Sequence, residues 1–186
     1  MARLITHLFS PVGVAALVFP GITVLTEEGI RGCLVAVAVF SVFPVALVKR
    51  LKAAWKIDDI YDPEPSMRAR ILALGNVVYV VGIISLMAVG AGPVTLWSAA
   101  SFLCGGTLVW GISRFWKISI HAVGVAGGAV ILVAIGGGAL WPVVLAPVAV
   151  GWARLQLGAH TLAQLGAGTL LGAAVAGTLL PLFLGR

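Results

Sequence analysis

Charge and cysteine are both scarce in this sequence. Only 10% of the 186 residues are charged, and only two are cysteine, with no CxxC spacing between them. A soluble domain usually carries about 25% charged residues, and a soluble fold of this length could not hide its remaining apolar surface. The composition therefore excludes an ordinary cytosolic enzyme, a disordered chain and a disulfide scaffold.

Apolar residues fill the chain instead. They make up 61% of it, and the mean hydropathy is +1.13. Because about 20 apolar residues span a bilayer, we expect a single integral membrane domain over residues 1–186. Its fold class is then an all-α polytopic transmembrane helical bundle with about six to seven spans. The apolar runs predict helices near residues 8–25, 31–48, 71–91, 94–113, 121–137, 139–153 and 161–183, with a tight turn at Gly136, Gly137 and Gly138.

Positive charge is unevenly distributed along the chain. Twelve Lys and Arg face six Asp and Glu, which gives a net charge of +6. If seven helices alternate in direction, ten of these twelve cations fall on one side of the membrane. The positive-inside rule then places that side, with the N-terminus, in the cytoplasm and the C-terminus outside the cell membrane. Membrane topology explains the basic charge first, so no nucleic-acid partner is expected.

The longest polar stretch is the segment 49–70, which we expect to form a polar loop on the basic side. Pro63 and Pro65 interrupt any continuous helix through it. Two further polar clusters, 114–121 and 154–164, fall on the same side. Ionisable residues are costly at the edge of a membrane, and those that face a bundle interior usually serve a site. The convergence of the three clusters therefore predicts a functional site there.

Two histidines give this predicted site its chemistry. His121 and His160 come from different clusters, and each has a cation nearby, Lys117 and Arg154 respectively. One imidazole can attack phosphorus while the other protonates the leaving oxygen, and cations can neutralise the phosphate oxygens. The arrangement therefore suits phosphoryl transfer.

These clusters resemble the last two motifs of the type 2 phosphatidic acid phosphatase superfamily, which read PSGH and SRxxxxxHxxxD. Ser119 and His121 match the serine and histidine of the former motif. Arg154 and His160 match the arginine and histidine of the latter at the same spacing, while Gln164 stands in place of its aspartate. The superfamily's first motif, KxxxxxxRP, is not present in that spacing, and its nearest candidates are Lys56, Arg68 and Arg70.

The resemblance implies a membrane lipid phosphatase-like enzyme that needs no metal or other cofactor. His160 would be the nucleophile that forms a phosphohistidine, and His121 the general acid. Gln164 would orient His160, although its amide brings no charge. The expected partners are membrane lipids and a phosphorylated lipid substrate, with an isoprenoid phosphate or diphosphate among the candidates, and hydrolysis or binding alone stays open. Phosphate binding is assigned to Arg154, Ser119, Lys117, Arg68, Arg70 and Lys56.

Two alternatives compete with this interpretation. Asp58, Asp59 and Asp62 form a DDxxD pattern that resembles the magnesium-diphosphate motif of prenyl-transferring enzymes, so a Mg²⁺-dependent enzyme that binds a prenyl diphosphate is the first alternative. However, the sequence has no acidic residue after Glu64 to form a second such cluster. The second alternative is a non-catalytic lipid-binding membrane subunit, because a fold alone does not establish an activity.

Overall fold

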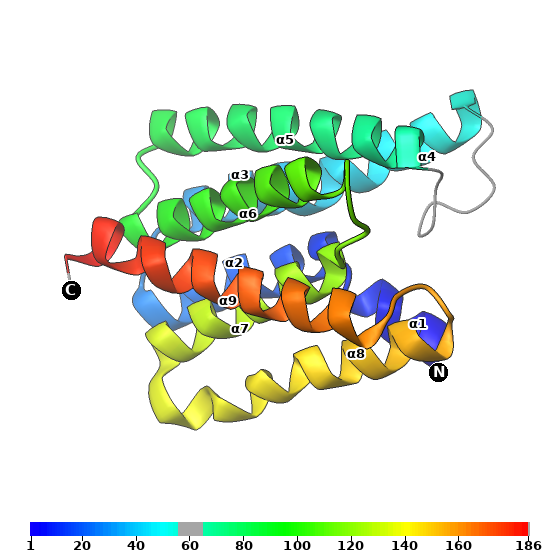
Figure 1. Ribbon diagram of the computed structural model, residues 1–186. Helices are drawn as coiled ribbons and strands as arrows, with labels where there is room; N and C mark the ends of the chain where they lie inside the picture. The colour runs from blue at the N-terminus through cyan, green and yellow to red at the C-terminus, as the bar shows by residue number, and fades with distance from the viewer. Residues whose placement is uncertain (56–64, 186) are drawn as a thin grey trace.

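The computed structural model describes residues 1–55 and 65–185, and within these ranges the chain is helical with no strand (Figure 1). This confirms the predicted all-α class. The elements in chain order are α1 (Ala2–Leu8), α2 (Pro11–Thr26), α3 (Ile30–Val37), the π-helical turn η1 (Ala38–Val42), α4 (Phe43–Trp55), α5 (Pro65–Ala88), α6 (Pro93–Ile112), α7 (Ile120–Gly136), the 3₁₀ segment η2 (Gly137–Leu145), α8 (Ala146–Gln156) and α9 (Leu162–Leu184).

Five helical segments in the described ranges are long and apolar enough to cross a membrane, and a sixth is obtained if the bent pair α1–α2 counts as one span. A multi-pass membrane protein is therefore supported; five spans are fewer than the six to seven predicted, and the count with the bent pair reaches six. One of the five, Ile120–Gln156, is 37 residues long and contains α7, η2 and α8. The ribbon reverses direction at η2, close to the predicted glycine turn, and the two termini lie at opposite ends of the bundle (Figure 1).

Two predicted boundaries differ from the structure. The first predicted helix, 8–25, corresponds to α2, which begins at Pro11, and the separate short helix α1 precedes it at a bend of 51°. Ser10 causes the break, because its hydroxyl donates to the His7 carbonyl at 2.9 Å and accepts from Gly13 N at 3.3 Å. The predicted polar loop 49–70 is also shorter than expected, since residues 49–55 continue α4 and residues 65–70 already belong to α5.

Glycines allow α7 and α9 to pack closely. A Cβ on Gly172 would lie 2.1 Å from the Val123 carbonyl oxygen, and one on Gly168 would lie 2.7 Å from the Ser119 carbonyl oxygen. Small residues at this spacing let helix backbones approach each other in membranes. The Gly168–Gly172 pair therefore serves helix packing, as its GxxxG spacing predicts.

Buried aromatic side chains connect the other helices. Phe40 of η1 stacks on Tyr79 of α5 with ring centroids 4.8 Å apart, and it also contacts Phe19 of α2 at 5.3 Å. Phe102 of α6 completes the cluster, 6.3 Å from Tyr79. Such aromatic pairs contribute about 0.5–1.5 kcal/mol each beyond the area that they bury. The cluster holds α2, η1, α5 and α6 together in the middle of the bundle.

A carboxylate joins two connections at one end of the bundle. Glu28, between α2 and α3, accepts hydrogen bonds from Val94 N at 2.7 Å and from Thr95 N at 3.0 Å. Its Oε2 also accepts from the Thr95 hydroxyl at 2.7 Å. Because these are the first N–H groups of α6, the negative charge of Glu28 satisfies unpaired donors and interacts favourably with the helix dipole.

Candidate functional site

A cavity of about 440 Å³ lies where α5 begins and α8 ends. Aliphatic side chains of α2, α4 and α5 form most of its wall, and no Asp or Glu is among the described residues that line it. Four of the predicted site residues, which come from separate parts of the sequence, line this cavity together: Arg68, His121, Arg154 and His160. Both histidines and Arg154 therefore line the same cavity, although they come from separate polar clusters of the sequence.

Arg154 and His160 are brought together by a short turn after α8. Gly158 adopts a left-handed conformation with φ of 63°, and Ala159 N donates to the Arg154 carbonyl oxygen at 3.1 Å. Glycine suits this turn because it has no Cβ to clash. The chain therefore folds back, and Arg154 Nε donates to His160 Nδ1 at 3.3 Å. Both side chains are buried, and Arg154 is only 1% exposed.

His121 lies in the first turn of α7, buried at the same cavity. Arg68, Arg154 and His160 are close enough to interact with it electrostatically, as is His7 of α1. The site thus combines two guanidinium groups with imidazoles in an apolar surrounding. Such a surrounding strengthens electrostatic interactions relative to water, so it favours an anionic ligand.

Arg68 connects the start of α5 to the segment before α7. Its Nε donates to the Ser113 hydroxyl at 3.3 Å, and its guanidinium also donates to the Ile118 carbonyl oxygen. Ile118 is three residues before His121, so Arg68 helps to position the segment that carries this histidine. The side chain is only 8% exposed and lines the cavity.

Three of the predicted phosphate ligands do not line the cavity. Ser119 is fully buried, and its hydroxyl accepts from Ala122 N at 3.4 Å, so it serves as the N-cap of α7. Arg70 is exposed on α5, and Lys117 lies in the segment between α6 and α7; neither contributes to the lining. Ser119 was assigned from its match to a motif, and Arg70 and Lys117 from their places in the polar clusters; neither pattern shows in which direction a side chain points.

Gln164 does not orient His160. Its Oε1 accepts from Thr161 N at 3.0 Å, while its backbone N–H donates to the Thr161 hydroxyl at 3.3 Å. This reciprocal pair is a capping box at the start of α9. The structure instead gives Arg154 as the partner of His160 Nδ1, which puts a donor where the resembled superfamily has an acceptor.

Four candidates lie outside the described residues: Lys56 and the aspartates Asp58, Asp59 and Asp62. Over residues 1–55 and 65–185, no group of three or more His, Cys, Asp or Glu side chains could hold a metal ion. The described part of the site is therefore built from cations and imidazoles.

Sequence reasoning missed several polar residues of the lining. His7 precedes the Ser10–Pro11 break, and Asn76 is a lone amide within the apolar helix α5. A lone polar residue in a membrane helix is a signal that could have identified Asn76. Lys49 and Lys52 add positive charge from α4, where both are exposed.

Comparison of the chain with protein-family models, with curated proteins and with solved structures finds no match. The likeness to type 2 phosphatidic acid phosphatases therefore depends on the motif residues of the sequence alone.

Proposed function

We propose that this protein is a membrane lipid phosphatase that binds the head group of a phosphorylated lipid in the cavity. The observation that carries this proposal is the convergence of Arg68, His121, Arg154 and His160 on one cavity with apolar walls. Guanidinium groups suit phosphate because they can make two parallel hydrogen bonds to its oxygens. Apolar walls suit the start of a lipid tail, and an isoprenoid phosphate or diphosphate is one candidate.

The reaction would proceed in two steps. His160 Nε2 attacks phosphorus and forms a P–N bond, while the P–O bond to the lipid alcohol breaks and His121 gives a proton to the leaving oxygen. In the second step water gives a proton to His121 and attacks the phosphohistidine. The P–N bond breaks, which releases inorganic phosphate and restores both histidines. Arg154 and Arg68 would stabilise the charge that develops on the phosphate oxygens.

The hydrogen bond from Arg154 Nε to His160 Nδ1 determines which nitrogen of His160 carries the proton before the first step. A neutral imidazole that accepts at Nδ1 carries its proton on Nε2. Attack through Nε2 therefore requires Arg154 to turn from His160 to the phosphate and the imidazole proton to move from Nε2 to Nδ1. The same bond favours a second candidate function, in which the protein holds a lipid phosphate without cleaving it. In that case the Nε2–H group of His160 would donate to a phosphate oxygen.

Phosphate release by the purified protein tests the proposal. We expect release from lipid phosphates that survives EDTA and falls at least about a thousandfold in His160→Ala, because loss of a nucleophile leaves only the contributions of binding and electrostatics. Arg31→Ala is the matched control, since it removes an exposed cation from α3, away from the cavity.

Other outcomes distinguish the alternatives. Activity that is abolished by EDTA and by Asp58→Asn would contradict the proposal and support the magnesium enzyme. Absence of turnover together with retained binding of lipid phosphate would support the non-catalytic subunit.

A further inference from the structure

One face of α5 runs along the cavity from its charged end to its aromatic end. Arg68, Leu72, Gly75 and Tyr79 recur at intervals of three or four residues, and all of them line the cavity. At a rise of 1.5 Å per residue, the eleven steps from Arg68 to Tyr79 cover about 16 Å. This length is close to half of the roughly 30 Å thickness of a bilayer's hydrocarbon core.

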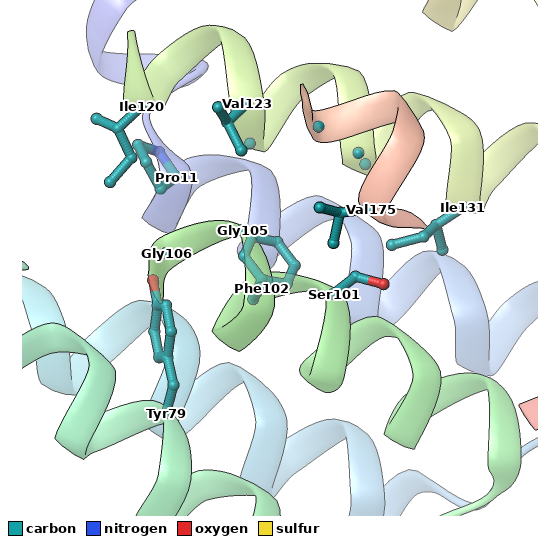
Figure 2. Close-up of a pocket in the computed structure, with 14 residues that line it drawn as sticks. Pro11, Tyr79, Ser101, Phe102, Gly105, Gly106, Ile120, Val123, Ile131 and Val175 are labelled. Atoms are coloured by element: carbon teal, nitrogen blue, oxygen red, sulfur yellow. The ribbon is translucent and has the colours of Figure 1, made fainter. Parts of the chain in front are cut away.

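Tyr79 lines the cavity at the aromatic end of this face. Its ring stacks on Phe40, with an angle of 18° between the ring planes, and the aromatic cluster fixes it there. A second, smaller hollow of about 40 Å³ lies beyond it among α2, α6, α7 and α9, and several glycines line it. Figure 2 shows Tyr79 reaching from α5 toward Gly106 of α6 at the border of this hollow. The residues shared by both hollows are Pro11, Tyr79, Gly106 and Ile120.

We infer that Tyr79 limits the length of the lipid tail that the cavity accepts. The inference rests on the proposed function, because it places the phosphate at the end of the cavity near Arg68 and Arg154. A single tail then follows the α5 face between α4 and α5, and its end meets the Tyr79 ring after about 16 Å. The cavity therefore selects lipid phosphates whose tail is about as long as one leaflet is thick.

Alkylphosphonates are suitable probes of this selection, because their P–C bond is not hydrolysed. Three tails are compared, with extended lengths of about half, equal to and twice the 16 Å distance. Affinity of the native protein should rise from the short to the intermediate tail as more methylene groups are buried. It should then fall for the long tail, because Tyr79 obstructs it.

Tyr79→Ala removes the ring that separates the two hollows. We expect the ratio of long-tail to intermediate-tail affinity to rise about tenfold, which corresponds to burial of about two further methylene groups. Tyr79→Phe is the matched control, since it keeps the ring and should keep the native length preference. An unchanged ratio in a folded Tyr79→Ala protein would overturn the inference.

Gly75→Leu tests the same path from its middle. A Cβ at Gly75 meets no atom within 4 Å, so a larger side chain can enter the cavity, and replacing glycine within a helix also favours folding. The variant should lose about tenfold in affinity for the intermediate tail and keep its affinity for the short one. Gly177→Leu on α9, which also has open space and lies outside the lining, is the control.

The short-tail probe separates the two proposals. If the short phosphonate binds, but neither the native protein nor Gly75→Leu differs in its affinity for the three tails, the length limit is wrong while the phosphate site stands. If even the short phosphonate does not bind, the proposed function fails, and the inference fails with it.

Discussion

The α7–α9 half of the molecule and the α4–α5 half are built in opposite ways. Between α7 and α9, glycines bring the backbones into contact, and Trp97 Nε1 of α6 donates to the Ala176 carbonyl oxygen at 2.9 Å in a fully buried position. In the other half, α4 packs sparsely on α5, and the large cavity occupies the space beside them. The dense half holds His121 and the start of α9 in place, while the open half leaves room for a ligand.

The largest expected effect is a loss of stability when a large side chain is placed between α7 and α9. In Gly172→Leu the new Cβ would lie 2.1 Å from the Val123 carbonyl oxygen, which is backbone and cannot move aside. Overpacking of this kind costs at least about 1–3 kcal/mol, and here we expect α7 and α9 to separate. The measurement is the yield of monodisperse protein in detergent and its thermal unfolding.

Gly177→Leu provides the comparison for that variant. It lies on the same helix, but a Cβ there meets no atom within 4 Å. If both glycine variants unfold at the same temperature, the contact between α7 and α9 is not what stabilises this half.

Arg154→Ala should have the next largest effect, on binding rather than on folding. Removal of one buried charged group from a recognition site costs about 2–5 kcal/mol, so the affinity for a short alkylphosphonate should fall by about 30-fold or more. Calorimetry in detergent measures this loss. Arg31→Ala carries the same change of charge at an exposed position, and an equal loss there would mean that net charge alone attracts the ligand.

The smallest effect is expected at Glu28. Glu28→Gln removes the charge that accepts from Val94 N and Thr95 N, so the free energy of unfolding should decrease by about 1 kcal/mol. Phosphonate affinity should not change, because Glu28 does not line the cavity. Glu27→Gln is the matched control: Glu27 is exposed, and its loss should not alter stability. A reduced phosphonate affinity in Glu28→Gln would show that the contact between Glu28 and α6 is coupled to the cavity.

Much of the fold could be predicted because hydropathy alone determines where apolar helices run. The predicted helix 161–183 agrees with α9 to within one residue at each end, and 94–113 agrees with α6 equally well. The short helix α1 was not predicted, and the start of α2 was placed at residue 8 instead of Pro11, although serine before proline is a typical start of a helix. We also did not predict that α3, η1 and α4 form one continuous helical segment as far as Trp55. The predicted helix ended at residue 48 because the charged Lys49 follows.

The site could be predicted in part. Arg154 and His160 lie six residues apart, and the turn between them brings them together, so a local pattern was enough to find this pair. Gln164 was misassigned although Thr161-x-x-Gln164 has the spacing of a capping box, because the resemblance to a catalytic motif was given more weight than local helix chemistry. His7 could not be assigned, since nothing in the sequence indicates that α1 lies beside the cavity.

The sequence by itself determined that this chain is an apolar, all-helical membrane protein whose few ionisable groups concentrate at one end. It did so because the cost of charge in a bilayer restricts where these residues can lie. Only the tertiary structure decided which of them share a cavity. It brought Arg68 to the two histidines, left Arg70 at the surface and committed Ser119 and Gln164 to helix caps. The reason is geometric: the direction in which a side chain points depends on its place in a helix turn and on the packing of neighbouring helices.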